Sequence, residues 1–358
     1  MMAPWTRRWR RIRDVARVLP GPVVTLAVVI AVLLTSKAAG GPQQTSAASV
    51  PRFTNQTLPR LDGSTSAEPL LALLACRSLG LPCGWRTFYF TELPRSMRPL
   101  GPIEEWPPAF PRSRDDTRAP KLMTSGTHGA YEALIAGRAD FIIVAREPSE
   151  PERRMARDAR VPLRITPVAW DALVFVVNRG NAIGKLTLNQ VRDIYTRRVL
   201  RWADVGGASQ EPIRPLVRNP ESGSAELFAK HVTLSPTGEA VSDRLVPTMM
   251  GVIDAVGSGP NDIGYTVYYY AKTFLEAAGL ARGGPGPHFK LIAIDGVEPT
   301  DETIAKGTYR LREPVYAVIR QDAPRAIAGL HDWLSSADGQ RVVSESGYLP
   351  ILEVARVR

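Results

Sequence analysis

Three short loops rich in glycine, serine and threonine each come directly before a segment with helical patterning. The first turn of a helix has backbone N–H groups without partners inside the helix and carries a partial positive charge. One such loop is most simply a helix cap, but three in one chain favour a site for an anion. The loops are Gly63-Ser64-Thr65-Ser66, Thr124-Ser125-Gly126-Thr127-His128-Gly129 and Glu221-Ser222-Gly223-Ser224.

Arg218 lies four residues before Ser222 of the third loop. Its guanidinium presents a planar fork of donors with a fixed charge, which can hold two oxygens of one anion. Together with the hydroxyl-rich loops, Arg218 predicts a site for a small oxyanion.

The sequence contains none of the motifs Gly-x-Ser-x-Gly, Gly-x4-Gly-Lys-Ser/Thr and His-Glu-x-x-His, which mark common hydrolase, nucleotide and zinc sites. Its histidines are His128, His231, His288 and His331, and none has a partner at metal-ligand spacing. We therefore expect no enzyme activity, no metal and no cofactor. A secreted phosphatase that uses His128 is the alternative, and turnover of a phosphate ester would reveal it.

Short β-branched runs alternate with turn-and-helix units from Pro59 onward, which predicts the α/β fold class. The stretch 84–120 carries seven prolines among mixed charges, so it cannot form a regular helix or a central strand, and we interpret it as a surface insertion. The predicted strands are 141–145, 172–178 and 314–319, and the predicted helices are 68–79, 130–137, 187–195, 225–231 and 323–335.

The amino-terminal region has the pattern of an export signal. Basic residues in 1–20 are followed by the 13-residue apolar run Pro22–Leu34 and by the small-residue pattern Ser36-Lys37-Ala38. Since a membrane span needs about 20 apolar residues, we expect 1–40 to be a cleaved signal peptide. An uncleaved membrane anchor over 21–39 is the alternative, and the polar stretch 41–58 is predicted to be a linker.

The positive charge of the chain is concentrated in that same region. Residues 1–40 hold seven basic and one acidic side chain, so they carry +6 of the net +10. The remaining +4 is a weak field for a domain of this size, so we expect no nucleic-acid partner and membrane contact only through the amino-terminal segment.

Cys76 and Cys83 fit an oxidising compartment. In one continuous helix, a spacing of seven residues would separate them by about 10 Å, too far for a disulfide. Gly80 and Pro82 would end the helix before Cys83 and so allow the bond. A disulfide and two buried thiols both stay open.

The order and spacing of six motifs over residues 60–352 resemble the phosphate-binding proteins of bacterial ABC importers, within the type II periplasmic-binding-protein superfamily. The motifs are Asp62–Ser66, Gly137–Phe141, Arg218 with Ser222–Ser224, Asn261–Tyr265, Asp295–Thr300 and Gly347–Pro350.

This resemblance implies two α/β lobes joined by crossing strands, with the ligand in the cleft between them. We expect the domain to span 59–352, with 84–120 inserted in the first lobe. The first lobe would comprise 59–165 and 270–352, and the second 166–269. The implied function is that of an exported, periplasmic or cell-surface substrate-binding protein that captures inorganic phosphate for an ABC permease. The alternatives are a receptor for another oxyanion such as sulfate, and a membrane-tethered phosphate sensor or interaction module.

Position by position, the resemblance implies that each of the three loops contributes residues that bind phosphate. At one position, this chain departs from the pattern of some relatives. Some relatives carry a carboxylate after the strand 141–145, where it accepts the proton of hydrogen phosphate, whereas this chain has Arg146. With Arg146 facing the ligand we expect weaker discrimination against sulfate, unless Glu68 or Glu221 accepts the proton instead. A surface salt bridge, for example to Glu147, is the alternative role for Arg146. The implied ligand residues are Thr65, Ser66, Ser125, Thr127, Arg146, Arg218, Ser222, Gly223 and Ser224.

Overall fold

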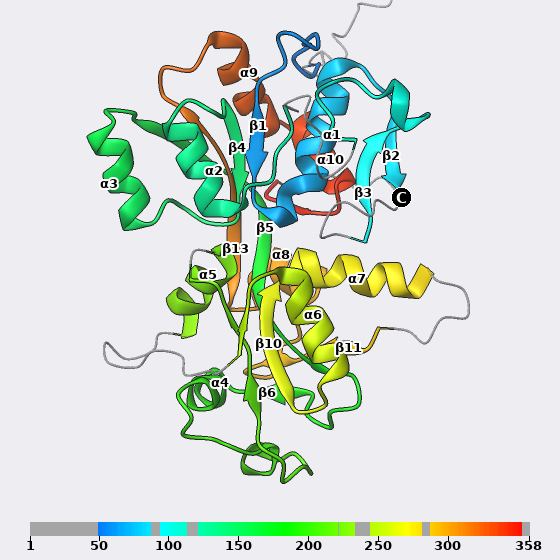
Figure 1. The fold of residues 1–358 in the computed structure, drawn as a ribbon, viewed down its shortest axis with the longest axis vertical. Helices are drawn as coiled ribbons and strands as arrows, with labels where there is room; N and C mark the ends of the chain where they lie inside the picture. The colour runs from blue at the N-terminus through cyan, green and yellow to red at the C-terminus, as the bar shows by residue number, and fades with distance from the viewer. Residues whose placement is uncertain are drawn as a thin grey trace, which may run out of the picture. The chain divides into compact units, whose positions relative to one another are not determined.

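A computed structural model describes residues 49–86, 94–112, 121–220, 222–232, 244–280 and 287–352 (Figure 1). The predicted signal peptide or anchor, residues 1–40, lies outside the described residues, as do residues 41–48 of the predicted linker 41–58. The linker prediction is wrong for the described part, because Leu58 is buried in a hydrophobic core and Val50 and Phe53 pack against that core. A search of the described residues finds no helix with the length and apolar character needed to cross a membrane.

A mixed eight-stranded sheet runs through the molecule in the order β1-β4-β13-β5-β10-β7, with β11 and β14 also paired to β5. Strand β1 pairs with β4 in parallel, whereas β13 pairs antiparallel with both β4 and β5, and β10 pairs antiparallel with β5. The bounds are β1 Leu61–Gly63, β4 Phe141–Val144, β5 Leu163–Asn178, β7 Arg214–Pro215, β10 Asp262–Val267, β11 Phe289–Leu291, β13 Arg312–Arg320 and β14 Leu349–Pro350.

Helices pack on this sheet, which confirms the predicted α/β class (Figure 1). They are α1 Glu68–Leu79, α2 Gly126–Ile135, α3 Glu150–Asp158, α4 Leu188–Tyr195, α5 Gly223–Val232, α6 Met249–Ser258, α7 Tyr268–Leu280, α8 Asp301–Lys306, α9 Arg325–Leu334 and α10 Ala337–Glu345. The short strands β2 Cys83–Arg86, β3 Ser96–Pro99, β6 Lys185–Leu186, β8 Val217–Arg218, β9 Leu245–Val246 and β12 Ala293–Ile294 form separate two-stranded pairs.

The long strands β5 and β13 pass between two groups of elements, which we call the first and second lobes (Figure 1). The first lobe has a core built from residues between 58 and 169 and between 315 and 348, together with Tyr269. The second lobe has its main core between residues 172 and 311. Where β5 leaves the first lobe, the Arg312 guanidinium stacks on Trp170, 3.8 Å from the ring centroid.

The predicted lobe boundary after residue 269 is wrong. Tyr270, Phe289 and Ile304 are all buried in the core of the second lobe, although 270–311 was assigned to the first. The reason lies in the path of the chain, because β11 pairs with the second-lobe end of β5 and the chain returns to the first lobe only along β13.

Within its described part, the proline-rich stretch 84–120 is not a surface insertion. Every residue of β3 is buried, and Met97, Trp106 and Phe110 belong to the core of the first lobe. Proline limits regular hydrogen bonding but does not prevent the apolar residues between prolines from packing inward. Residues 87–93 and 113–120 lie outside the described residues.

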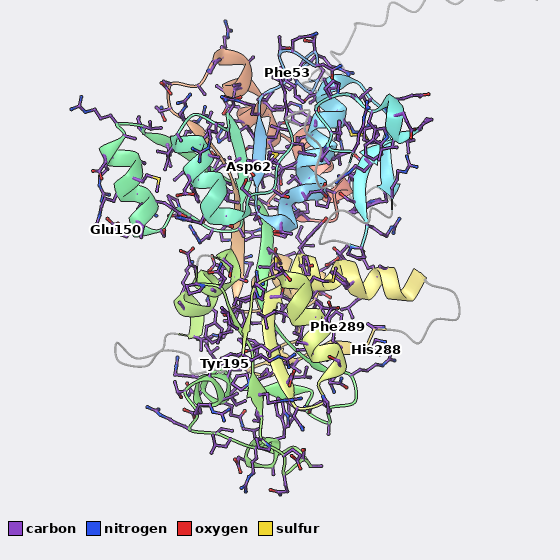
Figure 2. All side chains as sticks on the ribbon, viewed as in Figure 1. Phe53, Asp62, Glu150, Tyr195, His288 and Phe289 are labelled. Carbon is purple, nitrogen blue, oxygen red and sulfur yellow. A yellow bond between two sulfur atoms is a disulfide. The ribbon has the colours of Figure 1, made fainter. Side chains whose placement is uncertain are left out.

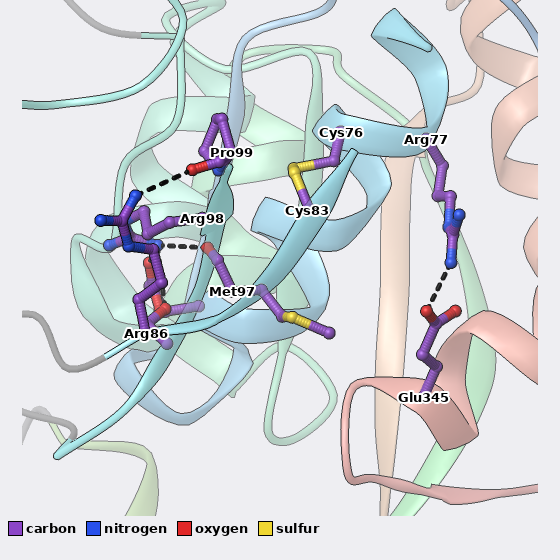
Figure 3. The surroundings of a disulfide bond; sticks show 10 residues. Cys76, Arg77, Cys83, Arg86, Met97, Arg98, Pro99 and Glu345 are labelled. Atoms are coloured by element: carbon purple, nitrogen blue, oxygen red, sulfur yellow. Dashed lines mark hydrogen bonds and ion pairs between the residues drawn. A yellow bond between two sulfur atoms is a disulfide. The ribbon is translucent and has the colours of Figure 1, made fainter. Parts of the chain in front are cut away.

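Cys76 and Cys83 form a disulfide, with their Cα atoms 6.1 Å apart (Figure 3). The left-handed conformation of Gly80, at φ 73°, ends α1 between them and turns the chain toward β2. Of the two states that the sequence left open, the structure has the disulfide.

Candidate functional site

All three glycine-rich loops contribute to one pocket of about 450 Å³ lined by both lobes. The first lobe supplies the residues after β1 and at the start of α2, and the second supplies the end of β8 and the start of α5. The predicted ligand residues that line the pocket are Thr65, Ser66, Ser125, Thr127, Arg218, Ser222, Gly223 and Ser224.

Gly63 places the first loop. A Cβ atom at this position would lie 2.3 Å from the carbonyl oxygen of Ile143 and 2.9 Å from Cδ1 of Leu71. The close approach of β1 to both β4 and α1 therefore requires glycine. The chain then turns directly into the helical segment, which brings Thr65 and Ser66 to the pocket.

Asp62, labelled in Figure 2, connects the first loop to the second through hydrogen bonds with Ser125. The Ser125 backbone N–H and hydroxyl donate to the two Asp62 carboxylate oxygens, each at 2.8 Å. Burial raises the pKa of Asp62 above its ordinary value, although the hydrogen bonds from Ser125 act in the opposite direction. This link fixes the start of α2 at the pocket.

Thr127 presents a buried hydroxyl to the pocket. Its Oγ1 atom has no hydrogen-bond partner among the described residues. A Cβ atom on Gly223 would lie 2.6 Å from this Oγ1, so only glycine allows the start of α5 to approach α2 so closely. A buried donor without a partner is costly, and a bound ligand would satisfy it.

Arg218 ends β8 and is 7% exposed. Its Nε lies 3.3 Å from Ser224 Oγ, and one of its terminal nitrogens donates to the Val246 carbonyl at 3.3 Å. Its backbone N–H donates to the Tyr265 hydroxyl, whose pKa burial raises to about 12. These contacts hold the guanidinium of Arg218 at the pocket, which donors of the first lobe also line.

The prediction that Arg146 faces the ligand is wrong, because this residue is not among the described residues that line the pocket. Its terminal nitrogens donate to both oxygens of Glu152, at 2.6 and 2.9 Å. Its Nε pairs with Glu226, which lies on α5 in the second lobe. The alternative prediction, a salt bridge of Arg146, is correct in that Arg146 forms ion pairs. It is wrong in placing them at the surface and in naming Glu147, because the arginine is buried and the paired carboxylates belong to Glu152 and Glu226.

Of the two proposed substitute acceptors, Glu68 is not among the described residues that line the pocket. Glu68 is buried against Arg98 and Ser96, which hold its carboxylate inside the first lobe. Glu221 lies outside the described residues. Among the described residues, neither Arg146 nor Glu68 lies where it could set the selectivity for the ligand.

Glu132 and His128 both line the pocket, but neither the role of Glu132 nor the contact that orients His128 was predicted from the sequence. His128 Nδ1 lies 2.9 Å from Glu152, and its Nε2 lies 3.7 Å from Glu132. The spacing of four residues between His128 and Glu132 could have predicted that these two side chains are neighbours on one helix. Glu152 lies on another helix, so no spacing in the sequence could have predicted its contact with His128.

The described residues include no cluster of three histidine, cysteine, aspartate or glutamate side chains suited to a metal ion. The pocket lining includes helix starts, hydroxyl groups and Arg218, which are donors that suit a tetrahedral oxyanion, together with His128 and Glu132.

Comparison with known proteins agrees with this donor set. The chain is 23% identical over 232 residues to the phosphate-binding protein PstS of Staphylococcus saprophyticus, covering 64% of this chain and 70% of the relative. It is 26% identical over 248 residues to PstS of Pseudomonas aeruginosa, covering 64% and 74%.

A solved structure shares the fold. It is a Clostridium perfringens protein described as a phosphate ABC transporter substrate-binding protein with bound phosphate, with a TM-score of 0.59 and 18% identity. The match covers 82% of this chain and 98% of that one. A family described as a PBP superfamily domain matches residues 107–338. Because this match extends over more than half of the sequence and agrees with the two-lobed α/β fold, the chain belongs to the PBP superfamily.

Proposed function

We propose that this protein is an exported substrate-binding protein that captures inorganic phosphate and passes it to the permease of an ABC importer. The observation that carries the proposal is the pocket itself, which is lined by Arg218 of one lobe and by Thr127 of the other. The Thr127 hydroxyl has no hydrogen-bond partner among the described residues. The named function of the PstS relatives supports the same ligand.

Binding would exchange the hydration shell of the anion for fixed donors. Arg218 offers a charge-assisted pair of hydrogen bonds, and the starts of α2 and α5 offer backbone N–H groups with partial positive charge. Because these groups come from both lobes, a ligand that contacts all of them favours the arrangement in which the lobes are together. The ligand is bound and released unchanged, so the proposal assigns no catalytic residue.

Export to the periplasm or cell surface is part of this proposal. The Cys76–Cys83 disulfide supports an oxidising compartment, since such bonds are rare in the cytosol. Whether residues 21–39 remain as an anchor is decided by the amino-terminal sequence of the mature protein.

Calorimetry of the purified protein tests the proposal, with phosphate, arsenate and sulfate as ligands and a phosphate ester as a substrate control. We expect binding of one phosphate per chain and no ester turnover. A protein that binds sulfate more tightly than phosphate would be a receptor for another oxyanion, and one that takes up no anion would overturn the proposal.

A further inference from the structure

Phosphate and sulfate differ chiefly in a proton. Near neutral pH, phosphate carries at least one P–O–H group, whereas sulfate offers only acceptor oxygens. Hydroxyl and amide side chains can turn a donor toward either ion, so they discriminate weakly. A carboxylate can only accept, and it therefore favours the ligand that has a proton to donate. The following inference rests on the proposed function and concerns which side chains accept that proton.

Glu152 fixes the tautomer of His128. Glu152 is fully buried, and it accepts two hydrogen bonds from Arg146 and one from the Ser149 backbone N–H. Burial raises the pKa of Glu152, but the hydrogen bonds and charge of Arg146 outweigh it, so the pKa lies below its ordinary value. An ionised Glu152 can only accept, and Nδ1 of His128, 2.9 Å away, must therefore be the donor.

The other ring nitrogen is then an acceptor when His128 is neutral. Nε2 of His128 lies 3.7 Å from Oε1 of Glu132, and both residues line the pocket. In the neutral form of the ring, Nε2 of His128 and the carboxylate of Glu132 are therefore two acceptors that face each other. A ligand O–H group could donate to either, whereas an oxygen without a proton would be repelled.

The charged groups around His128 come from several elements. Glu132 lies on α2, the same helix as His128, and Glu152 lies on α3. Arg146 follows β4 and contacts Glu152, which in turn contacts His128. Glu226 on α5 pairs with Arg146, and Arg218 lines the same pocket from the second lobe. The buried Arg146–Glu152 pair stabilises the orientation of the ring, and the side chain of Glu132 is 44% exposed.

We propose that His128 and Glu132 together form the proton acceptor by which this pocket prefers hydrogen phosphate to sulfate, and that Glu152 and Arg146 are positioning residues for His128. This assignment reverses the expectation of weak discrimination that followed from placing Arg146 at the ligand.

The test compares Glu132→Gln and His128→Gln with two matched controls. The controls are Glu302→Gln, exposed on α8, and His288→Gln in the second lobe (Figure 2); neither residue lines the pocket among the described residues. Competition of sulfate with labelled phosphate at pH 8 gives the ratio of the two dissociation constants. We expect each pocket variant to lower the phosphate preference by at least about tenfold, and the controls to keep it.

Ser125 is the rival acceptor, because its hydroxyl proton is directed at Asp62. An Asp62→Asn variant measured in the same assay separates the two. A loss of preference in Asp62→Asn, with the preference retained in Glu132→Gln and His128→Gln, would assign the acceptor to Ser125 and overturn this inference. A parent protein that binds no phosphate would overturn the proposed function instead.

A second measurement needs only the parent protein. Nitrogen chemical shifts of the His128 ring at pH 8, assigned through bonds from the backbone, report which nitrogen carries the proton. We expect a protonated Nδ1 and an unprotonated Nε2. The opposite tautomer would overturn the assignment even if the variants failed to fold.

Discussion

The two walls of the pocket use different chemistry. The first lobe contributes neutral donors together with His128 and Glu132, whereas the second contributes the fixed charge of Arg218 and the start of α5. In the proposed function, the fixed charge attracts any anion, whereas the acceptors His128 and Glu132 respond to the proton state of the ligand. If the proposed roles are correct, mutations in the second lobe should mainly change affinity and mutations in the first lobe should mainly change selectivity.

The largest expected effect comes from removing the charge of the second wall. Arg218→Ala should weaken phosphate binding by about 3–5 kcal/mol, because the anion and the buried donors around it lose their charged partner. Arg218→Lys should recover only part of this loss, since an ammonium cannot replace the guanidinium fork. Calorimetry measures both, with Arg310→Ala, exposed on the second lobe and paired with Asp295, as control. Unchanged phosphate affinity in Arg218→Ala would contradict the proposal that the second lobe supplies the charge that binds the anion.

Asp171 lies on β5, the strand that passes between the two lobes, and its ionisation should make the stability of the protein depend on pH. Burial raises the pKa of this carboxyl to about 7, although the backbone N–H groups of Tyr269 and Ala172 oppose the shift. In the unfolded chain the group ionises near 3.8, so between these values the folded state keeps a proton that the unfolded state has released. The resulting contribution to stability is complete below pH 4 and is lost as the pH rises through about 7.

Asp171→Asn should remove this pH dependence of the free energy of unfolding. The variant should therefore be more stable than the parent at pH 8 by about 2–4 kcal/mol. Denaturant unfolding at pH 4 and pH 8 measures the change, with Asp322→Asn as a control on an exposed turn. Parallel pH profiles for the parent and Asp171→Asn would show that the carboxyl is already ionised in the folded protein.

Thr127→Val tests whether the uncharged donors of the first lobe contribute to phosphate binding. The substitution keeps the shape of the side chain and removes the hydroxyl that has no partner among the described residues, so it should weaken phosphate binding by about 1–2 kcal/mol. Because one buried unsatisfied group is removed, the free energy of unfolding without ligand should stay the same or increase. An equal loss of affinity in Thr308→Val, at an exposed position, would contradict this role.

The smallest effect is expected where the walls touch each other. Glu226→Gln weakens the ion pair with Arg146 across the lobes without altering the pocket lining. Small-angle scattering should show a larger radius of gyration for this variant without phosphate and an unchanged radius with saturating phosphate. Phosphate affinity should fall by less than about 1 kcal/mol, because the ligand itself restores the contact.

Sequence reasoning worked best where local residue types determine local structure. The three loops and Arg218 were predictable because helix starts and a guanidinium carry their chemistry with them. Helix α1 has the predicted bounds, Glu68–Leu79. By contrast, α2 begins inside its loop at Gly126, and β5 begins at Leu163, because the predicted strand 172–178 was only the apolar part buried in the second lobe.

The role of Arg146 could not be predicted, because its partners Glu152 and Glu226 lie on separate helices and meet it only in the folded chain. The lobe boundary failed for a similar reason. Nothing in the pattern of 270–311 distinguishes the two cores, and only the pairing of β11 with β5 places it in the second lobe.

The disulfide uses both cysteines of the chain and leaves no free thiol. A single cysteine introduced at the rim of the pocket would therefore be the only site for a thiol-reactive dye. Since the dye would report local changes on ligand uptake without background labelling, the natural chain is already suited to conversion into a fluorescent sensor. Reducing agents would remove this advantage, because they would expose Cys76 and Cys83 to the same reagent.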